Sequence, residues 1–204
     1  PTGYDYASFD LDWDHACAVT DQRKVWCWGN NSWGQTSPPD SADFVQVAVG
    51  DRDSCGLREN GTIVCWGLMA QHDISFPEGK YRQLSGGNDH FCALRYDVGE
   101  IECISNENLF EEADPPAGIH FRMVASGGSH SCAIREDNSI ACWGFDTYGE
   151  STPPDRHFAT VSLGQLSACG LDLLGGIYCW GLSVDNVPPE LDVDAFAEYV
   201  SLFL

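Results

Sequence analysis

Residues 130–144, which read HSCAIREDNSIACWG, decide how this chain folds. The two cysteines of this stretch stand ten residues apart, on either side of the turn-forming pair Asp137-Asn138. Side chains alternate between two faces on both arms of the turn, and a period of about two residues is that of a β-strand. The stretch therefore predicts a β-hairpin that carries one cysteine on each strand.

The cysteines repeat this hairpin five times along the chain. Within a pair, the second cysteine follows the first by ten residues, or by eleven in the third pair, and first members recur every 37 to 40 residues. The pairs are Cys17 and Cys27, Cys55 and Cys65, Cys92 and Cys103, Cys132 and Cys142, and Cys169 and Cys179. A fixed period of this length is typical of a repeat protein.

The residues around the cysteines repeat as well. A histidine stands two residues before the first cysteine in three repeats, at His15, His90 and His130. Trp-Gly follows the second cysteine in four repeats, whereas the third repeat has Ile104-Ser105 there. An apolar stretch precedes each first cysteine, so each repeat predicts three strands. Both faces of these strands are apolar, and both must therefore be covered.

The paired cysteines suit cross-strand disulfides. Each pair is centred on a turn, so its two Cα atoms lie opposite each other, and a non-hydrogen-bonded pair brings them within disulfide range. Buried free thiols and a metal site are the two alternatives, but the pairs lack the short Cys-x-x-Cys spacing of zinc sites. We expect five disulfides, no metal and a protein outside the cytosol.

The charge of the chain excludes several kinds of partner. The 204 residues include ten Lys or Arg against 31 Asp or Glu, which gives a formal net charge of −21 at pH 7. A surface this negative repels nucleic acid and anionic membranes. No apolar stretch is long enough to span a bilayer, so we expect no membrane insertion. No phosphate-binding loop or nucleophile elbow is present in the sequence, and we expect no cofactor.

A repeat of this length with two-faced strands predicts a blade of a β-propeller, with the recurring Trp filling the gap between blades. The order His-x-Cys-Ala-Leu, Gly-x-Val-x-Cys-Trp-Gly, Asn-x-x-Gly-Gln and then Pro resembles the repeats of the regulator-of-chromosome-condensation (RCC1) family. The cysteine-bearing form is most similar to the extracellular propellers of plant crinkly-type receptor kinases. The likeness runs from about Tyr6 to about Leu202. Family members usually have seven blades, so five repeats leave open a five-bladed ring, a fragment, or an arc that another chain completes.

We expect one all-β propeller domain over residues 1–204, with repeats at about 6–43, 44–80, 81–120, 121–157 and 158–196. About residues 197–204 then form one strand more than five repeats need, because Tyr199-Val200-Ser201-Leu202 is similar to Thr160-Val161-Ser162-Leu163. Such a strand can cap the closing blade or add to a neighbouring molecule. We expect an assembly strand that joins molecules head to tail, made by Tyr199, Val200, Leu202 and Leu204.

Two groups of polar residues are candidates for ligand binding. His15, His90 and His130 occupy one repeat position, which favours a structural hydrogen bond over a ligand site, since the other repeats have Asp53 and Ser167 nearby. Asp10, Asp12 and Asp14 alternate, which predicts that all three carboxylates lie on one strand face. This acidic run lacks the turn glycine and terminal Glu of a calcium loop, so a solvated face is favoured over calcium.

Two Asn-x-Ser/Thr triplets, at Asn30 and Asn60, predict N-glycosylation. The expected disulfides independently imply the secretory route that this modification needs. The resemblance implies a secreted or cell-surface protein that acts by binding or assembly and is not an enzyme. Its partners are then other copies of itself, another extracellular protein or a glycan. The alternative is a carbohydrate-active or other hydrolytic enzyme with carboxylates at the propeller axis, which a cluster of Asp or Glu with raised pKa in one pocket would favour.

Overall fold

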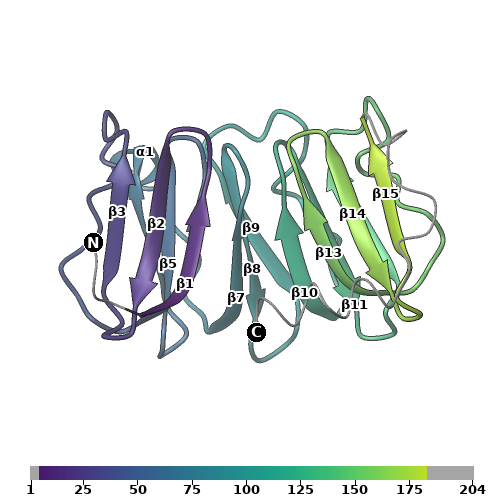
Figure 1. Cartoon of the computed structure of the whole chain (residues 1–204), viewed down its shortest axis with the longest axis horizontal. Coiled ribbons are helices and arrows are strands. Elements are labelled where there is room, and N and C mark those ends of the chain that lie inside the picture. Colours follow the sequence, from purple (N-terminus) through teal and green to yellow (C-terminus); the bar gives the residue numbers. More distant parts are fainter. Residues whose placement is uncertain (1–4, 183–204) are drawn as a thin grey trace.

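The computed structural model describes residues 5–182, which form five three-stranded antiparallel sheets and one short helix. Each sheet is one blade, and its strands follow one another in chain order (Figure 1). The first strand of each blade is called the leading strand below. The assembly strand predicted at Tyr199, Val200, Leu202 and Leu204 lies outside the described residues.

The five blades have closely matched strand bounds. The leading strands are β1 (Tyr6–Leu11), β4 (Phe44–Val49), β7 (Tyr81–Gly86), β10 (Phe121–Ser126) and β13 (Phe158–Leu163). The middle strands are β2 (His15–Thr20), β5 (Asp53–Arg58), β8 (His90–Arg95), β11 (His130–Arg135) and β14 (Ser167–Asp172). The outer strands are β3 (Val25–Gly29), β6 (Ile63–Gly67), β9 (Ile101–Ser105), β12 (Ile140–Gly144) and β15 (Ile177–Gly181).

The predicted hairpins and disulfides are confirmed. In each blade the two cysteines are directly opposite each other in the middle and outer strands, as Cys132 is to Cys142. Disulfides join all five pairs, with Cα atoms 4.0 to 4.1 Å apart. This spacing is close to that of a non-hydrogen-bonded antiparallel pair, so the pairing follows from the hairpin register.

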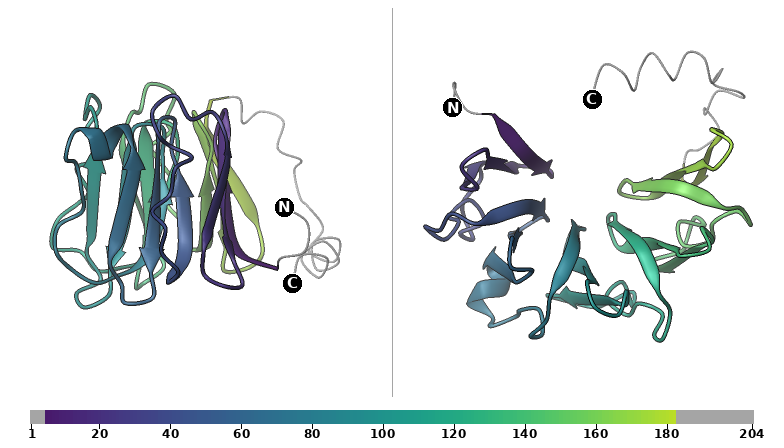
Figure 2. Two further views of the ribbon diagram at one scale, coloured as in Figure 1. Left: turned by 90° about the vertical axis from the view of Figure 1, so that its left-hand side faces the viewer. Right: turned by 90° about the horizontal axis from the view of Figure 1, so that it is seen from below.

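The blades fan around a common axis as an open arc. Seen along that axis in Figure 2, the first and fifth blades stand at the two ends of the arc with an opening between them. Residues of all five leading strands line one channel along the axis, among them Ser8, Gln46, Gln83, Val124 and Val161. The leading strands are therefore innermost and the outer strands face away from the axis.

The apolar core lies between blades. On one face of each blade the disulfide projects toward the next blade, and we call this the disulfide face. It packs against the leading strand of the next blade, as Cys17 and Val19 pack against Phe44 and Val47. The first residue of the later leading strands is an aromatic with almost no exposure, at Phe44, Tyr81, Phe121 and Phe158. This arrangement explains why both faces of the strands in the second, third and fourth blades are apolar, because each of these blades has a neighbour on each side.

Side chains on the leading strands also tie neighbouring blades together. The Gln46 amide accepts from the Leu84 backbone N–H at 3.0 Å and donates to the Leu84 carbonyl at 2.8 Å. The Gln83 amide makes the same pair of bonds to Val124, each at 3.0 Å. These bonds satisfy backbone groups on the inner edges of β7 and β10, which have no further strand beside them.

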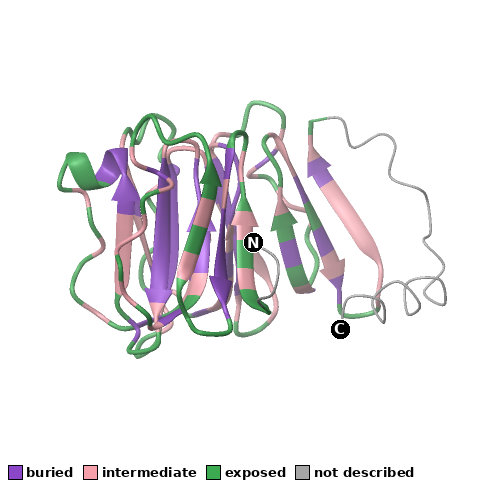
Figure 3. Ribbon diagram, turned by 60° about the vertical axis from the view of Figure 1, so that its left-hand side comes forward, coloured by how far each residue is buried: buried purple, intermediate pink, exposed green. Residues whose placement is uncertain are grey.

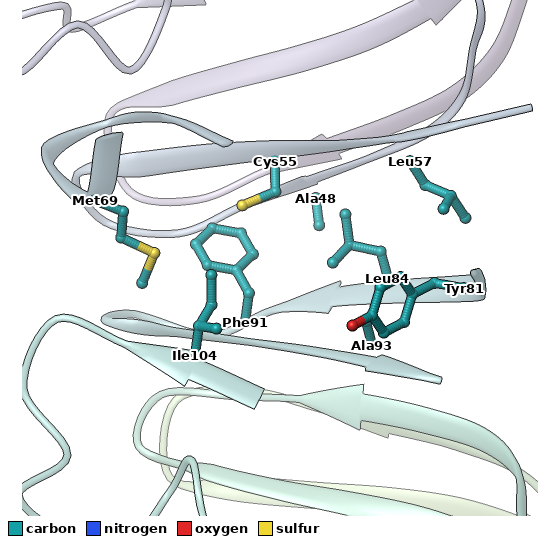
Figure 4. Packing of buried hydrophobic residues seen from close by; sticks show 9 residues of the cluster. All are labelled: Ala48, Cys55, Leu57, Met69, Tyr81, Leu84, Phe91, Ala93 and Ile104. Atoms are coloured by element: carbon teal, nitrogen blue, oxygen red, sulfur yellow. The ribbon is translucent and has the colours of Figure 1, made fainter. Parts of the chain in front are cut away.

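The interface between the second and third blades differs from the others. A four-residue helix α1 (Leu68–Gln71), which the sequence did not predict, follows β6, and the Asp53 carboxylate accepts the Met69 backbone N–H at 2.6 Å. Met69 packs in the cluster that includes Phe91 and Ile104 (Figure 4). Ile104 stands where other repeats have Trp, so the Met69 side chain fills volume that an indole fills elsewhere.

Candidate interaction surface

The two ends of the blades form two different faces of the arc. Leading and outer strands run in the same direction, because each pairs antiparallel with the middle strand. The ends of both therefore share one face, at the top of Figure 1, which we call the upper face. The hairpin turns between middle and outer strands lie on the opposite, lower face. Within the described residues, no helix has the length and apolar character needed to cross a membrane.

Three aromatic side chains project from equivalent turns on the upper face. Trp33, Phe110 and Tyr148 each follow the outer strand of their blade by a few residues, and each is 41 to 52% exposed. Phe145 joins the last two, because its ring centroid is 5.0 Å from that of Phe110 and 6.4 Å from that of Tyr148. Exposed aromatic groups held in one place are typical of binding surfaces.

The aromatic turns are rigid for a reason that lies in their sequence. Two residues after each aromatic is a buried Gln or Glu, at Gln35, Glu112 and Glu150, whose side-chain oxygen accepts the aromatic residue's backbone N–H at 2.8 to 2.9 Å. The residue between them has positive φ, 61 to 88°, at Gly34, Glu111 and Gly149. The same backbone shape thus presents all three side chains.

Charge is distributed unevenly between the two faces. Of the ten Lys and Arg residues, all of which lie within the described part of the chain, only Arg52 is on the upper face. On the lower face, basic groups pair with carboxylates, as Arg95 does with Asp97 at 3.0 Å and with Glu102 at 2.9 Å. Arg52 pairs with Asp89 at 2.6 Å and with Asp51 at 3.7 Å. The upper face also carries Asp12, Asp14, Glu107, Glu111 and Asp146, so its charge is negative overall.

A cavity of about 260 Å³ opens at the upper end of the axis. Its lining includes Asp10, Asp12, Asn88, Ser126 and Gln165 together with glycine turns. The Asn88 and Gln165 amides form a mutual pair, at 2.9 and 3.1 Å, between the third and fifth blades. Burial raises the pKa of both Asp10 and Asp12, so two weakly acidic carboxylates lie at this cavity.

The acidic run at the start of the chain does not form one strand face. Asp10 is in β1, where its carboxylate accepts the Val49 N–H at 2.9 Å and the Leu11 N–H at 3.0 Å. The prediction is wrong for Asp12 and Asp14, because β1 ends at Leu11 and the chain then turns; Asp14 accepts from the Asn30 side chain at 2.7 Å. Within residues 5–182, no group of three or more His, Cys, Asp or Glu side chains is placed to hold a metal ion.

The repeated histidines are structural, as predicted, in two of the three repeats. His15 Nε2 lies 3.0 Å from Ser54 Oγ, and His90 Nε2 lies 2.8 Å from Ser131 Oγ, so each bond joins a blade to the next. His130 is buried, and within the described residues its ring nitrogens have no hydrogen-bond partner. The fifth blade has Ala168 where the second and fourth have serine, which explains the missing bond.

The two glycosylation triplets differ in their surroundings. Both asparagines are exposed, and Asn60 is at the tip of the hairpin between β5 and β6. The Asn60 Oδ1 atom accepts from the Thr62 hydroxyl at 2.8 Å, and within the described residues its amide nitrogen donates no hydrogen bond. The Asn30 amide nitrogen donates to Asp14 at 2.7 Å. Asn60 is thus the better placed acceptor.

The sequence reasoning missed the aromatic turns. The repeat pattern read from the sequence included Asn-x-x-Gly-Gln, but not the aromatic residue that stands directly before the glycine. The sequence pattern that marks these turns is an aromatic residue two positions before a Gln or Glu. In the third repeat it is harder to see, because Glu111 has positive φ where the other two turns have glycine.

Comparison with known proteins supports the repeat. The family model for the regulator of chromosome condensation (RCC1) repeat matches residues 13–35, 44–71 and 123–150. The serine/threonine-protein kinase-like protein CCR2 of Arabidopsis thaliana is 28% identical over 159 residues, which is 63% of this chain and 20% of that protein. CCR4 of the same plant is 41% identical over 64 residues, 31% of this chain and 8% of that protein.

Solved structures share the fold. The ectodomain of the Physcomitrella patens receptor kinase CR4 superposes with a TM-score of 0.74 at 26% identity, over 86% of this chain and 52% of that one. The ectodomain of the Arabidopsis thaliana receptor kinase ACR4 has a TM-score of 0.69 at 24% identity, over 89% of this chain and 65% of that one. Prp20p of Saccharomyces cerevisiae has a TM-score of 0.74 at 20% identity, over 89% of this chain and 60% of that one. At this identity the comparison shows only that the two proteins share a fold. This chain thus spans about half to two thirds of these structures and a fifth of CCR2.

Proposed function

Because the chain is built of repeats of the RCC1 family and its structural neighbours are the ectodomains of crinkly-type receptor kinases, we propose that it is a non-catalytic interaction scaffold outside the cell. Five disulfides support the location, since such bonds persist in oxidising compartments. The observation that carries the proposal is the set of aromatic turns, which presents Trp33, Phe110 and Tyr148 from a rigid frame on one face.

The electrostatics of the upper face support one kind of partner. Unbalanced carboxylates surround the aromatic rings, and a protein surface rich in Lys and Arg complements both features. Its cations are drawn by the negative potential and can also lie over the aromatic faces. We therefore propose a basic extracellular protein as the partner, rather than an acidic protein or a sulfated glycan.

The alternative of a hydrolytic enzyme rests on the axial cavity, where Asp10 and Asp12 have raised pKa. The Asp10 carboxylate already accepts two backbone N–H groups, one from the next blade. It therefore acts as a tie between blades, which leaves Asp12 without the second carboxylate that glycoside hydrolysis uses. We propose that Asp10 is structural and that the chain has no catalytic role.

Self-association is the other part of the proposed function. The segment with Tyr199, Val200, Leu202 and Leu204 resembles a leading strand, and the inner edge of a leading strand is a site where another strand or side chain can bind. We propose that this segment joins molecules head to tail into filaments, and that N-linked glycans cover other parts of the secreted protein.

The test of the upper face is a binding comparison. The full chain, immobilised, is presented with a set of purified secreted proteins, both basic and acidic, and with sulfated glycans. We expect a basic protein to bind, and the double substitution Phe110→Ser with Tyr148→Ser to weaken it by about tenfold or more, as loss of aromatic anchors does. Binding also weakens as salt rises.

The matched control is Tyr96→Ser, because Tyr96 is 71% exposed but lies at the lower end of β8. This variant should bind like the unmodified chain. Selective binding of acidic proteins or glycans, or equal binding by the double variant, contradicts the proposed partner. For the terminal segment, deletion of residues 199–204 should weaken self-association while the disulfides remain, and unchanged self-association would contradict that part.

A further inference from the structure

Neighbouring blades contact each other in a similar way at several points along the chain. In three interfaces the indole N–H of a tryptophan donates to a backbone carbonyl in the preceding blade: Trp66 to Gln35 at 2.8 Å, Trp143 to Glu112 at 2.9 Å and Trp180 to Glu150 at 2.9 Å. These three tryptophans are 5 to 8% exposed. The interface therefore has a fixed chemistry: an indole and a leading strand on one side, and a disulfide face on the other.

The first blade has the indole half of this interface, and within residues 5–182 no blade packs against it. Trp28 occupies the same position as Trp66, but it is 52% exposed and its indole N–H donates no hydrogen bond to any residue in 5–182. Phe9 is 72% exposed, while its equivalents Val47, Leu84, Val124 and Val161 are at most 3% exposed. Figure 3 shows exposed residues along the strands beside the N label. We call Phe9, Leu11 and Trp28 the first-blade face.

The fifth blade has the other half uncovered. The first cysteine of each of the first four disulfides is fully buried, whereas Cys169 is exposed. Leu171 is half-buried, while its equivalents Val19, Leu57, Leu94 and Ile134 are at most 3% exposed. We call Cys169 and Leu171 the fifth-blade face. Within the described residues, the first and fifth blades thus expose the two complementary halves of a contact that the blades make four times with one another.

We propose that the first-blade face of one molecule docks on the fifth-blade face of a second copy, through the kinds of side chain that meet between internal blades and with the second copy displaced along the axis. The proposal rests on the proposed self-association and deepens it, because it adds a blade-to-blade contact made by described residues. It continues the interface already present between Cys17, Val19 and the second blade. Apolar side chains that are buried at every internal blade contact and exposed here are what such a contact would bury.

The shape of the arc fixes the kind of assembly. The two faces differ, so the contact is heterologous, and such contacts give closed rings or open helices. The five blades already sweep most of a turn (Figure 2), so a second copy in the same register meets the first unless it is also displaced along the axis. The contact therefore propagates as a helical filament and not as a flat ring.

The test uses one substitution at each end. Trp28→Asp puts a charge into the first-blade face, and Leu171→Asp does the same in the fifth-blade face. We expect the full chain to form concentration-dependent oligomers in analytical ultracentrifugation, and either variant alone to associate at least about thirtyfold more weakly, as loss of a central tryptophan anchor does. Tyr96→Asp, an exposed site on the third blade, is the control and should behave like the unmodified chain.

The decisive sample is an equal mixture of the two variants. Each retains one intact face, so a heterologous contact gives a one-to-one dimer that grows no further. A monomeric unmodified chain, association unaffected by Trp28→Asp, or a mixture without dimers overturns the proposal. Trp28 is exposed, so its variant should fold; Ile177→Asp on β15 replaces Leu171→Asp if the latter loses its disulfides. Deletion of residues 199–204 separates the two modes, since it removes the strand contact and leaves both blade faces intact.

Discussion

At the scale of the residue, one indole position has two environments in the same chain. Trp143 is buried and its N–H donates to the Glu112 carbonyl at 2.9 Å, while Trp28, with the same neighbours in sequence, is half exposed. Local sequence is nearly identical at the two positions. The difference comes from the preceding blade, which covers Trp143 and is lacking at Trp28 within the described residues.

Substitution of the two tryptophans should therefore have different costs. We expect Trp143→Ala to lower the free energy of unfolding by about 3 to 5 kcal/mol, because it leaves a cavity between blades and an unpaired carbonyl. Trp28→Ala should cost less than about 1 kcal/mol in dilute solution. Urea unfolding of both variants below the concentration of self-association gives the comparison, and equal losses would mean that the blades do not stack as described.

Buried histidine gives the fold a dependence on pH. Burial, with a smaller contribution from His130, lowers the pKa of His90 to about 3, whereas an unfolded histidine takes a proton near 6.5. The neutral ring belongs to the folded state, so its stabilising contribution is present above pH 6.5 and is lost as pH falls toward 3. The loss is about 1.4 kcal/mol per pH unit.

The variant His90→Gln tests this, because glutamine lacks the titration and can still bond to the Ser131 hydroxyl. Its free energy of unfolding should fall less steeply between pH 6 and pH 4 than that of the unmodified chain. His72, which shares no motif with the repeated histidines, gives the control His72→Gln. Parallel slopes in all three proteins would show that His90 is accessible to protons in the folded state.

Glycan occupancy should differ between the two triplets. A glycan bonds to the asparagine amide nitrogen, which donates to Asp14 at Asn30 and donates no bond to a described residue at Asn60. After expression in a eukaryotic secretory host, peptide mass mapping should find higher occupancy at Asn60 than at Asn30. Asp14→Ala should raise occupancy at Asn30. Occupancy that is higher at Asn30, or absent at both sites, would contradict the prediction.

At the scale of the element, the blade is a hairpin closed by a disulfide and preceded by a leading strand. The hairpins were predictable because strand period, turn residues and cysteine spacing all act within about a dozen residues. The leading strands were predictable from apolar stretches such as residues 44–49. The helix α1 was not, because four residues are too few for a helical period and its backbone is held by Asp53 from another strand.

The third blade tests whether Met69 fills the space that a tryptophan fills at the other blade interfaces. Ile104→Trp restores the residue of the other repeats, yet we expect it to destabilise the chain by about 1 to 3 kcal/mol, because Met69 already fills the space. Adding Met69→Ala should recover part of the loss, and a double-mutant cycle measures the coupling. A stabilising Ile104→Trp, or strictly additive effects, would show that Met69 does not take the place of the indole.

At the scale of the whole molecule, the described residues form an arc of five blades. Sequence reasoning reached the propeller and its repeat, because each blade is a local unit that recurs. It did not reach the exposure of Trp28 or Cys169, the aromatic turns or the uneven charge of the faces. Those properties depend on which blade stands next to which, and on which end of each strand points to which face.

The central claim is that each repeat is one disulfide-closed blade of an extracellular propeller arc. Peptide mapping of the native protein without reduction tests it most directly, because the links report the strand register of every blade. The structure predicts five links, each within one repeat: Cys17 to Cys27, Cys55 to Cys65, Cys92 to Cys103, Cys132 to Cys142 and Cys169 to Cys179. Free thiols, or links between different repeats, would contradict both the blade structure and the oxidising location.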